Sequence, residues 1–171
     1  MYRVLCHVAA LVSLVALSAA PLRAQDLAAP EGDVILTVTG AITTTNDGDS
    51  ARFDLGMLEA LEDRTIETAT IWTEGTKLFQ GVSLSTLVDT LGIEGDTLRA
   101  TAINDYTVEI PVSDAIEGGP MIAYRMDGEV MSVRNKGPLW IVYPYDGNSD
   151  YRTEVIYSRS IWQLDRIEAV E

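Results

Sequence analysis

Short runs of alternating apolar and polar residues recur along this chain and, more than any other feature, restrict it to a strand-rich fold. Alternation places the apolar side chains on one face of a β-strand. Such runs, together with segments rich in Thr, Ile and Trp, predict strands over residues 34–39, 65–73, 98–102, 106–110, 121–126 and 160–169. Residues 139–143 are apolar throughout, which is typical of a strand buried on both faces.

Two segments have helical spacing instead. Residues 55–61 carry leucines three positions apart, which predicts a short helix. The apolar residues of 82–91 fall on one helical face, with Ser83 as a candidate N-cap and Gly92 just past the end. Asp127-Gly128 predicts a hairpin turn. The pattern as a whole predicts a mixed, strand-rich α+β fold in a single domain.

The first 24 residues have the order of a secretory signal peptide. Arg3 is the charged start, residues 8–17 form an apolar run, and small residues precede a cleavage site predicted after Ala24. The apolar run is shorter than the about 20 residues that span a bilayer, so we expect no membrane insertion after cleavage and a periplasmic location. The predicted divisions are residues 1–24 as signal peptide, 25–33 as N-terminal lead-in and 34–171 as the domain.

Cys6 and His7 are the only cysteine and histidine, and both leave with the signal peptide. The mature protein therefore has no disulfide, no Ser-His-Asp or Cys-His arrangement, and no zinc site built on thiolate or imidazole. The full chain has a net charge of −14, which repels nucleic acid and anionic lipid. Asn46–Asp49 lacks the remaining ligands of a calcium loop and is interpreted as a turn.

Aromatic and polar residues gather at the ends of the predicted strands. Taken singly, each group has an ordinary explanation, because Trp and Tyr often anchor the edge of a core and Asn-Asp is often only a turn. The groups are residues 72–75, 104–106, 136–140, 143–145 and 159–162. Composition alone indicates no more than an exported α+β domain.

Taken in order, these groups resemble the motifs of the sulfite-oxidase-like, molybdopterin-binding oxidoreductase domain family, and its short exported members in particular. The matching segments are Trp72-Thr73, Phe79–Leu84, Ala102–Tyr106, Ile110-Pro111, Met126–Gly128, Lys136–Trp140, Tyr143–Asp146 and Ser160–Leu164. The match runs from about Val34 to the C-terminus. The resemblance implies a mixed α+β fold with a cleft shaped for a pterin.

Two departures from the family pattern bear on the cofactor. In catalytic relatives a cysteine thiolate binds molybdenum, but alignment on Gly81 puts Ala69 or a close neighbour at that position. The loop after Pro144, which is basic in catalytic relatives, carries Asp146 and Asp150. Two like charges about 4 Å apart cost on the order of 4 kcal/mol near a protein surface. These departures disfavour a phosphorylated metal cofactor and favour a reduced pterin without phosphate.

A pterin offers a flat ring for stacking and an amino group beside a ring N–H, and those two donors suit one carboxylate. Asp105 is the first candidate for that carboxylate, because it lies at a predicted turn beside Tyr106, and Glu74 is the second. The candidates for stacking are Trp72, Tyr106, Trp140 and Tyr143. Asn104 is the candidate for the remaining polar edge of the ring, and Arg125 or Arg159 for its carbonyl. Arg159 matches one of the family's basic positions, and Lys136 is a candidate for another.

The resemblance leaves three functional hypotheses. The leading one is a non-catalytic pterin-binding protein, since some family members without the cysteine are understood to bind a reduced pterin. Such proteins report it to a membrane-anchored partner, a cyclic-di-nucleotide enzyme or a histidine kinase. The alternative is a molybdopterin-dependent oxidoreductase whose metal centre lacks the protein thiolate. The third is an interaction protein with an empty cleft, in which the aromatic residues serve only as core.

Overall fold

The computed structural model describes residues 27–171, so the predicted signal peptide lies outside the described residues. This part of the chain combines three α-helices with ten strands. Their order is β1 (Leu36–Gly40), β2 (Ala51–Phe53), α1 (Leu55–Leu61), β3 (Arg64–Ala69), β4 (Thr76–Ser83), α2 (Leu84–Leu91), β5 (Thr97–Ala102), β6 (Thr107–Pro111), β7 (Met121–Met126), β8 (Glu129–Val130), β9 (Leu139–Val142), α3 (Glu154–Arg159) and β10 (Trp162–Val170).

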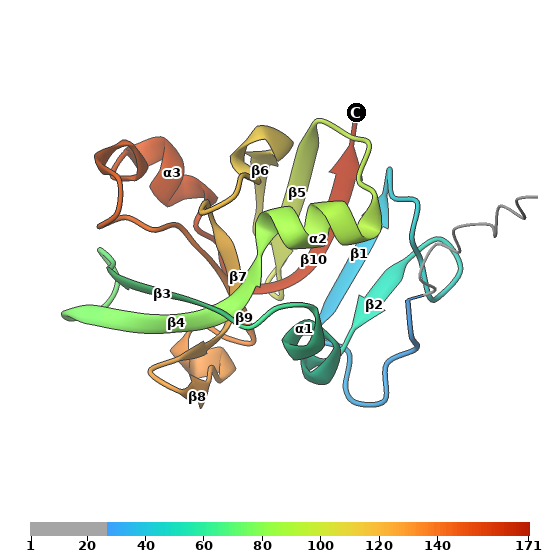
Figure 1. Cartoon of the computed structure of the whole chain (residues 1–171), viewed down its shortest axis with the longest axis horizontal. Coiled ribbons are helices and arrows are strands. Elements are labelled where there is room, and N and C mark those ends of the chain that lie inside the picture. The colour runs from blue at the N-terminus through green and yellow to red at the C-terminus, as the bar shows by residue number, and fades with distance from the viewer. Residues whose placement is uncertain (1–26) are drawn as a thin grey trace, which may run out of the picture.

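All ten strands belong to one mixed sheet whose main path is β2-β1-β10-β9-β7-β4-β3. β1 and β10 run parallel, whereas the other pairs are antiparallel. β10 pairs with β9 at its start and then with β5 and β1, and the register shifts after Trp162. Figure 1 shows β3 and β4 extending away from β1 and β2, with α2 across the front of the sheet. The α+β fold class predicted from the sequence is confirmed.

The core is centred on β9, all four of whose residues are buried. The largest of its buried side chains is Trp140, and Tyr143 and Tyr145 are buried just beyond the strand. Leu84, Leu87 and Leu91 of α2 are buried as well. The predicted strand buried on both faces is therefore confirmed.

The two predicted helices are present and their ends have clear causes. The Asp54 carboxylate caps α1 by accepting a hydrogen bond from the Met57 amide at 2.8 Å. At the start of α2, Ser83 makes no side-chain cap; its amide instead donates to the Glu62 carboxylate at 2.6 Å. Gly92 ends α2 in the left-handed conformation with φ 56°, which glycine adopts without steric cost.

Several elements differ from the sequence-based expectations. β3 ends at Ala69 and not at Thr73, so Trp72 lies in the turn that leads to β4. β4 was not expected, and Val82, assigned to the helix from its spacing, belongs to that strand. The short elements β2, β8 and α3 were also missed. Asp127-Gly128 does form the turn between β7 and β8, and Asn46–Asp49 leads into a turn that Asp47 and Ser50 close with a backbone bridge.

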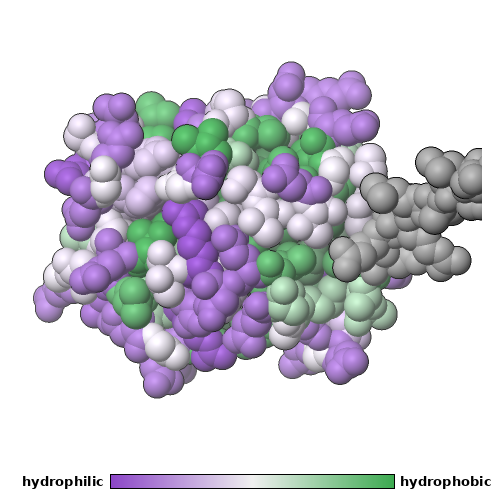
Figure 2. Space-filling model, in the orientation of Figure 1, coloured by the Kyte–Doolittle hydropathy of each residue, from purple (hydrophilic) through white to green (hydrophobic). Residues whose placement is uncertain are grey.

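The visible surface is mainly hydrophilic (Figure 2). In Figure 2 hydrophilic residues cover much of the visible face, and apolar residues show as separate groups between them. Within residues 27–171, no helix has both the length and the hydropathy needed to cross a bilayer.

Candidate functional site

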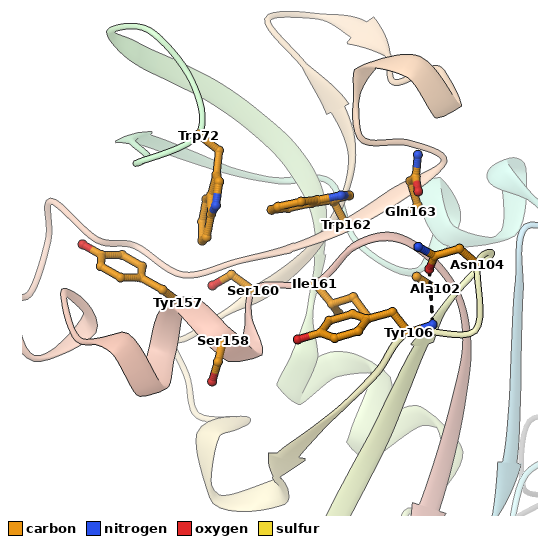
Figure 3. A pocket seen from close by; sticks show the side chains of 10 residues that line it. All are labelled: Trp72, Ala102, Asn104, Tyr106, Tyr157, Ser158, Ser160, Ile161, Trp162 and Gln163. Carbon is orange, nitrogen blue, oxygen red and sulfur yellow. Dashed lines mark hydrogen bonds between the residues drawn. The ribbon is translucent and has the colours of Figure 1, made fainter.

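A cavity of about 370 Å³ opens where three connecting segments meet (Figure 3). Its lining comes from Trp72 in the β3–β4 turn, from the end of β5 and the β5–β6 turn, and from the end of α3 and the start of β10. The lining residues of the last two regions are Ala102, Asn104, Tyr106, Tyr157, Ser158, Ser160, Ile161, Trp162 and Gln163. The volume falls within the range of about 300–1,000 Å³ that is usual for small-molecule sites. The three segments are far apart in the sequence, so the sheet topology is what brings them together.

Aromatic rings form much of the cavity wall. The Trp72 ring centroid lies 5.5 Å from that of Trp162, at an interplanar angle of 73°, and 5.7 Å from that of Tyr157, at 85°. These are edge-to-face contacts, the favoured arrangement for aromatic pairs. Tyr106 is 58% exposed and Trp162 is 37% exposed, so both rings retain surface that a ligand can cover. The wall is suited to a flat ring.

The polar groups of this cavity are uncharged. None of the side chains that line it is a carboxylate, a lysine or an arginine. Ser160 is already occupied, because it accepts from the Tyr145 hydroxyl at 2.6 Å and donates to the Ile156 carbonyl at 2.8 Å. Asn104 and Gln163 provide two amides at the opposite end from Tyr157 (Figure 3). The cavity therefore offers stacking and neutral hydrogen bonds.

A second cavity of about 320 Å³ adjoins the first, since Trp72, Trp162 and Gln163 line both. Arg134 and Lys136 contribute its cationic side chains. The Lys136 ammonium lies 5.6 Å from the centroid of the Trp140 ring and 5.9 Å from that of Trp162, within range of a cation–π contact. A neutral aromatic cavity is thus flanked by a basic one.

The position aligned with the metal-binding cysteine lies at the end of β3. The Ala69 amide donates to the Asp146 carboxylate at 2.6 Å, and the Asp146 amide donates in turn to the Thr68 hydroxyl at 3.1 Å. Asp146 also lies 3.6 Å from Arg152. Neither Asp146 nor Asp150 lines the two cavities. The repulsion of a phosphate by these carboxylates, inferred from the sequence, therefore has no support from where they lie.

Four of the ten candidate site residues lie at these cavities. Trp72, Asn104 and Tyr106 line the neutral cavity, and Lys136 lines the basic one. Asp105 is directed elsewhere, because its backbone is left-handed with φ 66° and its carboxylate pairs with Arg166 at 2.8 Å.

The other five candidates lie outside both linings. Glu74 is exposed. Trp140 and Tyr143 are fully buried, because they belong to the apolar run through the core. Arg125 pairs with Glu59 at 2.7 Å, and Arg159 pairs with Asp114 at 2.9 Å.

Tyr143 and Arg159 meet at the same acid and stabilise the fold. The Tyr143 hydroxyl donates to the Asp114 carboxylate at 2.7 Å. The pKa of Tyr143 is raised far above its usual range, mainly by burial and secondly by this hydrogen bond. The three side chains tie the loop after β6 to α3 and to the end of β9.

The candidate list missed several lining residues. Tyr157 and Ser158 lie in α3, a helix too short for its spacing to predict it. Trp162 and Gln163 belong to a matched family motif, and that motif was the available signal. Arg134 in the basic cavity had no signal beyond its proximity in sequence to Lys136.

Comparison with known proteins places the fold. A family model described as the oxidoreductase molybdopterin binding domain matches residues 58–147, more than half of the chain. The protein belongs to this family. The sulfane dehydrogenase SoxCD from Paracoccus pantotrophus has a similar structure, with a TM-score of 0.58 at 17% identity over 79% of this chain. This chain covers only 37% of that one, and at this identity the likeness shows the fold alone. No curated protein matches.

The family implies a molybdopterin-type cofactor, and the two halves of such a group fit this structure differently. A molybdenum centre with a protein thiolate does not fit, because no cysteine occurs between residues 27 and 171, and thus none at Ala69 or its close neighbours, where the alignment puts the metal-binding cysteine. The pterin half does fit, since the neutral cavity combines aromatic faces with amide groups.

Proposed function

We propose that this protein is an exported, non-catalytic pterin-binding member of the molybdopterin-binding oxidoreductase domain family. The observation that carries the proposal is the neutral aromatic cavity formed around Trp72, Tyr106 and Trp162, on a chain that lacks the metal-binding thiolate. A reduced pterin is uncharged near neutral pH and keeps a flat pyrimidinone ring that can stack on these side chains. Family membership supports a pterin over other flat heterocycles.

The composition of the cavity supports binding over catalysis. General acids and bases are His, Asp, Glu, Lys or Tyr, with His the most common, held close to the reacting group. Within the described residues the lining contains only the last of these types, as Tyr106 and Tyr157. We infer that the bound pterin acts as a signal and that the loaded protein reports it to a membrane-anchored partner, a cyclic-di-nucleotide enzyme or a histidine kinase.

Analysis of the purified protein tests the ligand. The protein is denatured, the supernatant is assayed for fluorescent pterins after oxidation, and molybdenum is measured on the same sample by elemental analysis. We expect pterin, retained or taken up on titration, and no stoichiometric molybdenum. Trp162→Ala should lose the pterin, whereas Ile71→Ala, an exposed apolar residue of the same turn as Trp72, should keep it. Stoichiometric molybdenum would overturn the proposal.

A complementation experiment tests the signalling role. Deletion of the gene should change the cellular level of a cyclic dinucleotide or the phosphorylation of a histidine kinase. A copy encoding Ile71→Ala should restore the original state, and a copy encoding Trp162→Ala should not. Equal restoration by both copies would separate the signal from the pterin and refute the sensor role.

The alternative function, a molybdopterin-dependent oxidoreductase without a protein thiolate, is favoured by one observation. Arg134 and Lys136 line the basic cavity next to the aromatic one. Arginine and lysine are the side chains that bind phosphate in proteins, so a phosphorylated pterin could place its anionic group there. This alternative predicts molybdenum and pterin in equal amounts, together with a visible spectrum that changes on reduction.

A further inference from the structure

The neutral cavity contains two amide side chains whose orientations are set by the backbone. The Asn104 Oδ1 atom accepts from the Tyr106 amide at 3.2 Å. The Gln163 Nε2 atom donates to the Val133 carbonyl at 2.8 Å. An amide side chain presents a donor at one end and an acceptor at the other. Each of these contacts therefore decides which end of the side chain stays available for a ligand.

The remaining ends form a defined pattern. Asn104 keeps its Nδ2 donor, and Gln163 keeps its Oε1 acceptor. Neither atom has a hydrogen-bond partner within residues 27–171. A flip of either amide would set a donor against the Tyr106 amide or an acceptor against the Val133 carbonyl. The two backbone contacts therefore fix Asn104 Nδ2 as a donor and Gln163 Oε1 as an acceptor.

The Asn104 and Gln163 side chains belong to neighbouring segments of the backbone. The Ile103 amide donates to the Gln163 carbonyl at 2.9 Å, and the Gln163 amide donates to the Lys136 carbonyl at 2.9 Å. Gln163 has φ 56°, a left-handed backbone that is uncommon for a residue other than glycine, at the register shift of β10. Such irregularities re-aim side chains and are frequent at functional sites. Figure 3 shows Gln163 and Asn104 at the same end of the cavity.

We propose that this pair selects the lactam edge of the ligand, on which a ring carbonyl stands beside a ring N–H. Asn104 Nδ2 donates to the carbonyl, and Gln163 Oε1 accepts from the N–H. The inference deepens the proposed function and rests on it, because it assigns ligand recognition within the same cavity. In this proposal the amide pair recognises the polar edge of the heterocycle in place of Asp105, which pairs with Arg166 outside the lining.

Two commercially available rings distinguish the two edges. Pterin carries the carbonyl and the ring N–H, whereas 2,4-diaminopteridine carries an amino donor and a bare ring nitrogen at those positions, which reverses the pattern. The wild-type protein should bind pterin more tightly than 2,4-diaminopteridine by at least about tenfold, since a mismatched edge leaves polar groups facing like groups. Both affinities are measured by fluorescence titration.

Asn104→Asp is the deciding variant. Its carboxylate still accepts from the Tyr106 amide, but its second oxygen turns the free donor into an acceptor. Pterin affinity should fall by about tenfold, and 2,4-diaminopteridine affinity should rise. Asn148→Asp is a matched control, because Asn148 makes the same contact, accepting from the Asp150 amide at 2.9 Å, and lies outside both cavities. The control should leave both affinities unchanged.

The outcomes separate the inference from the proposed function. If the wild-type protein binds neither ring, the pterin-binding function itself fails. If it binds pterin and the preference for pterin persists in Asn104→Asp, the function stands and the amide pair is refuted. Equal shifts in Asn104→Asp and Asn148→Asp would show a general effect of charge and would refute the pair as well.

Discussion

Replacement of Trp162 by alanine removes the ring on which the proposed ligand site most depends. Trp162 lines both cavities, and its centroid lies 5.5 Å from that of Trp72 and 6.2 Å from that of Trp140. Stacking of a nucleic-acid base on an aromatic side chain contributes about 1–3 kcal/mol. A pterin resembles a base in size and flatness, so its dissociation constant should rise about 5- to 150-fold.

The variant should remain folded. Trp162 makes edge-to-face contacts with two rings, and each such contact contributes about 0.5–1.5 kcal/mol. The free energy of unfolding should therefore fall by about 1–3 kcal/mol, which is less than the about 5–15 kcal/mol of a typical domain. Urea denaturation followed by circular dichroism measures this loss independently of the ligand.

Fluorescence titration with a pterin provides the affinity, and Trp162→Phe is the matched control. Phenylalanine keeps a flat ring at the same position, so this variant should retain most of the affinity. A dissociation constant for Trp162→Ala within about twofold of the wild-type value, with the fold intact, would refute stacking at this position.

Three further predictions concern residues around the site and the N-terminal lead-in. Asp105→Asn should leave pterin affinity unchanged in titration. It should lower the unfolding free energy by no more than about 1 kcal/mol, because the pair with Arg166 is exposed. A tenfold weaker affinity would support the binding role assigned to Asp105 from the sequence. Lys136→Met should weaken a pterin carrying a carboxylate or phosphate about tenfold in low salt and spare the neutral ring, and equal weakening of both would contradict a basic subsite. Backbone hydrogen bonds from Gly32 and Met57 lower the pKa of Asp54. Its ionised form therefore stabilises the fold above its ordinary pKa of 3.8, and the stability is lost as the pH falls. Asp54→Asn should thus be less stable than wild type in urea at pH 7, with the difference shrinking toward pH 3, and a constant difference would contradict this.

Sequence patterns predicted α1 and β7 with the bounds that the structure shows, although β7 buries four residues in a row and does not alternate. The unbroken apolar run correctly indicated the buried β9. β4 was not predicted because buried and exposed residues do not alternate in its second half. There Gly81 packs against the backbone of Ile122. α3 has only six residues, fewer than two helical turns.

Sequence motifs identified cavity-lining residues only where the local backbone has no irregular conformation that redirects the side chain. Trp72, Asn104 and Tyr106 were found from their motifs and do line the cavity. Asp105 lies outside the lining, because its left-handed backbone directs its side chain toward Arg166, and the Asn-Asp sequence does not reveal that φ angle. Trp140 also lies outside the lining, as its place inside the apolar run that predicted complete burial already indicated.

The hydrogen bond between the Ala69 amide and Asp146 has a consequence for the evolution of metal binding in this protein. A single change of Ala69 to cysteine would set a thiol beside a carboxylate already bound to that residue's own amide. The neighbouring negative charge would raise the pKa of the thiol and oppose the thiolate that a metal requires. A cysteine thiolate at this position is therefore expected to need the removal of the acid in addition to the cysteine.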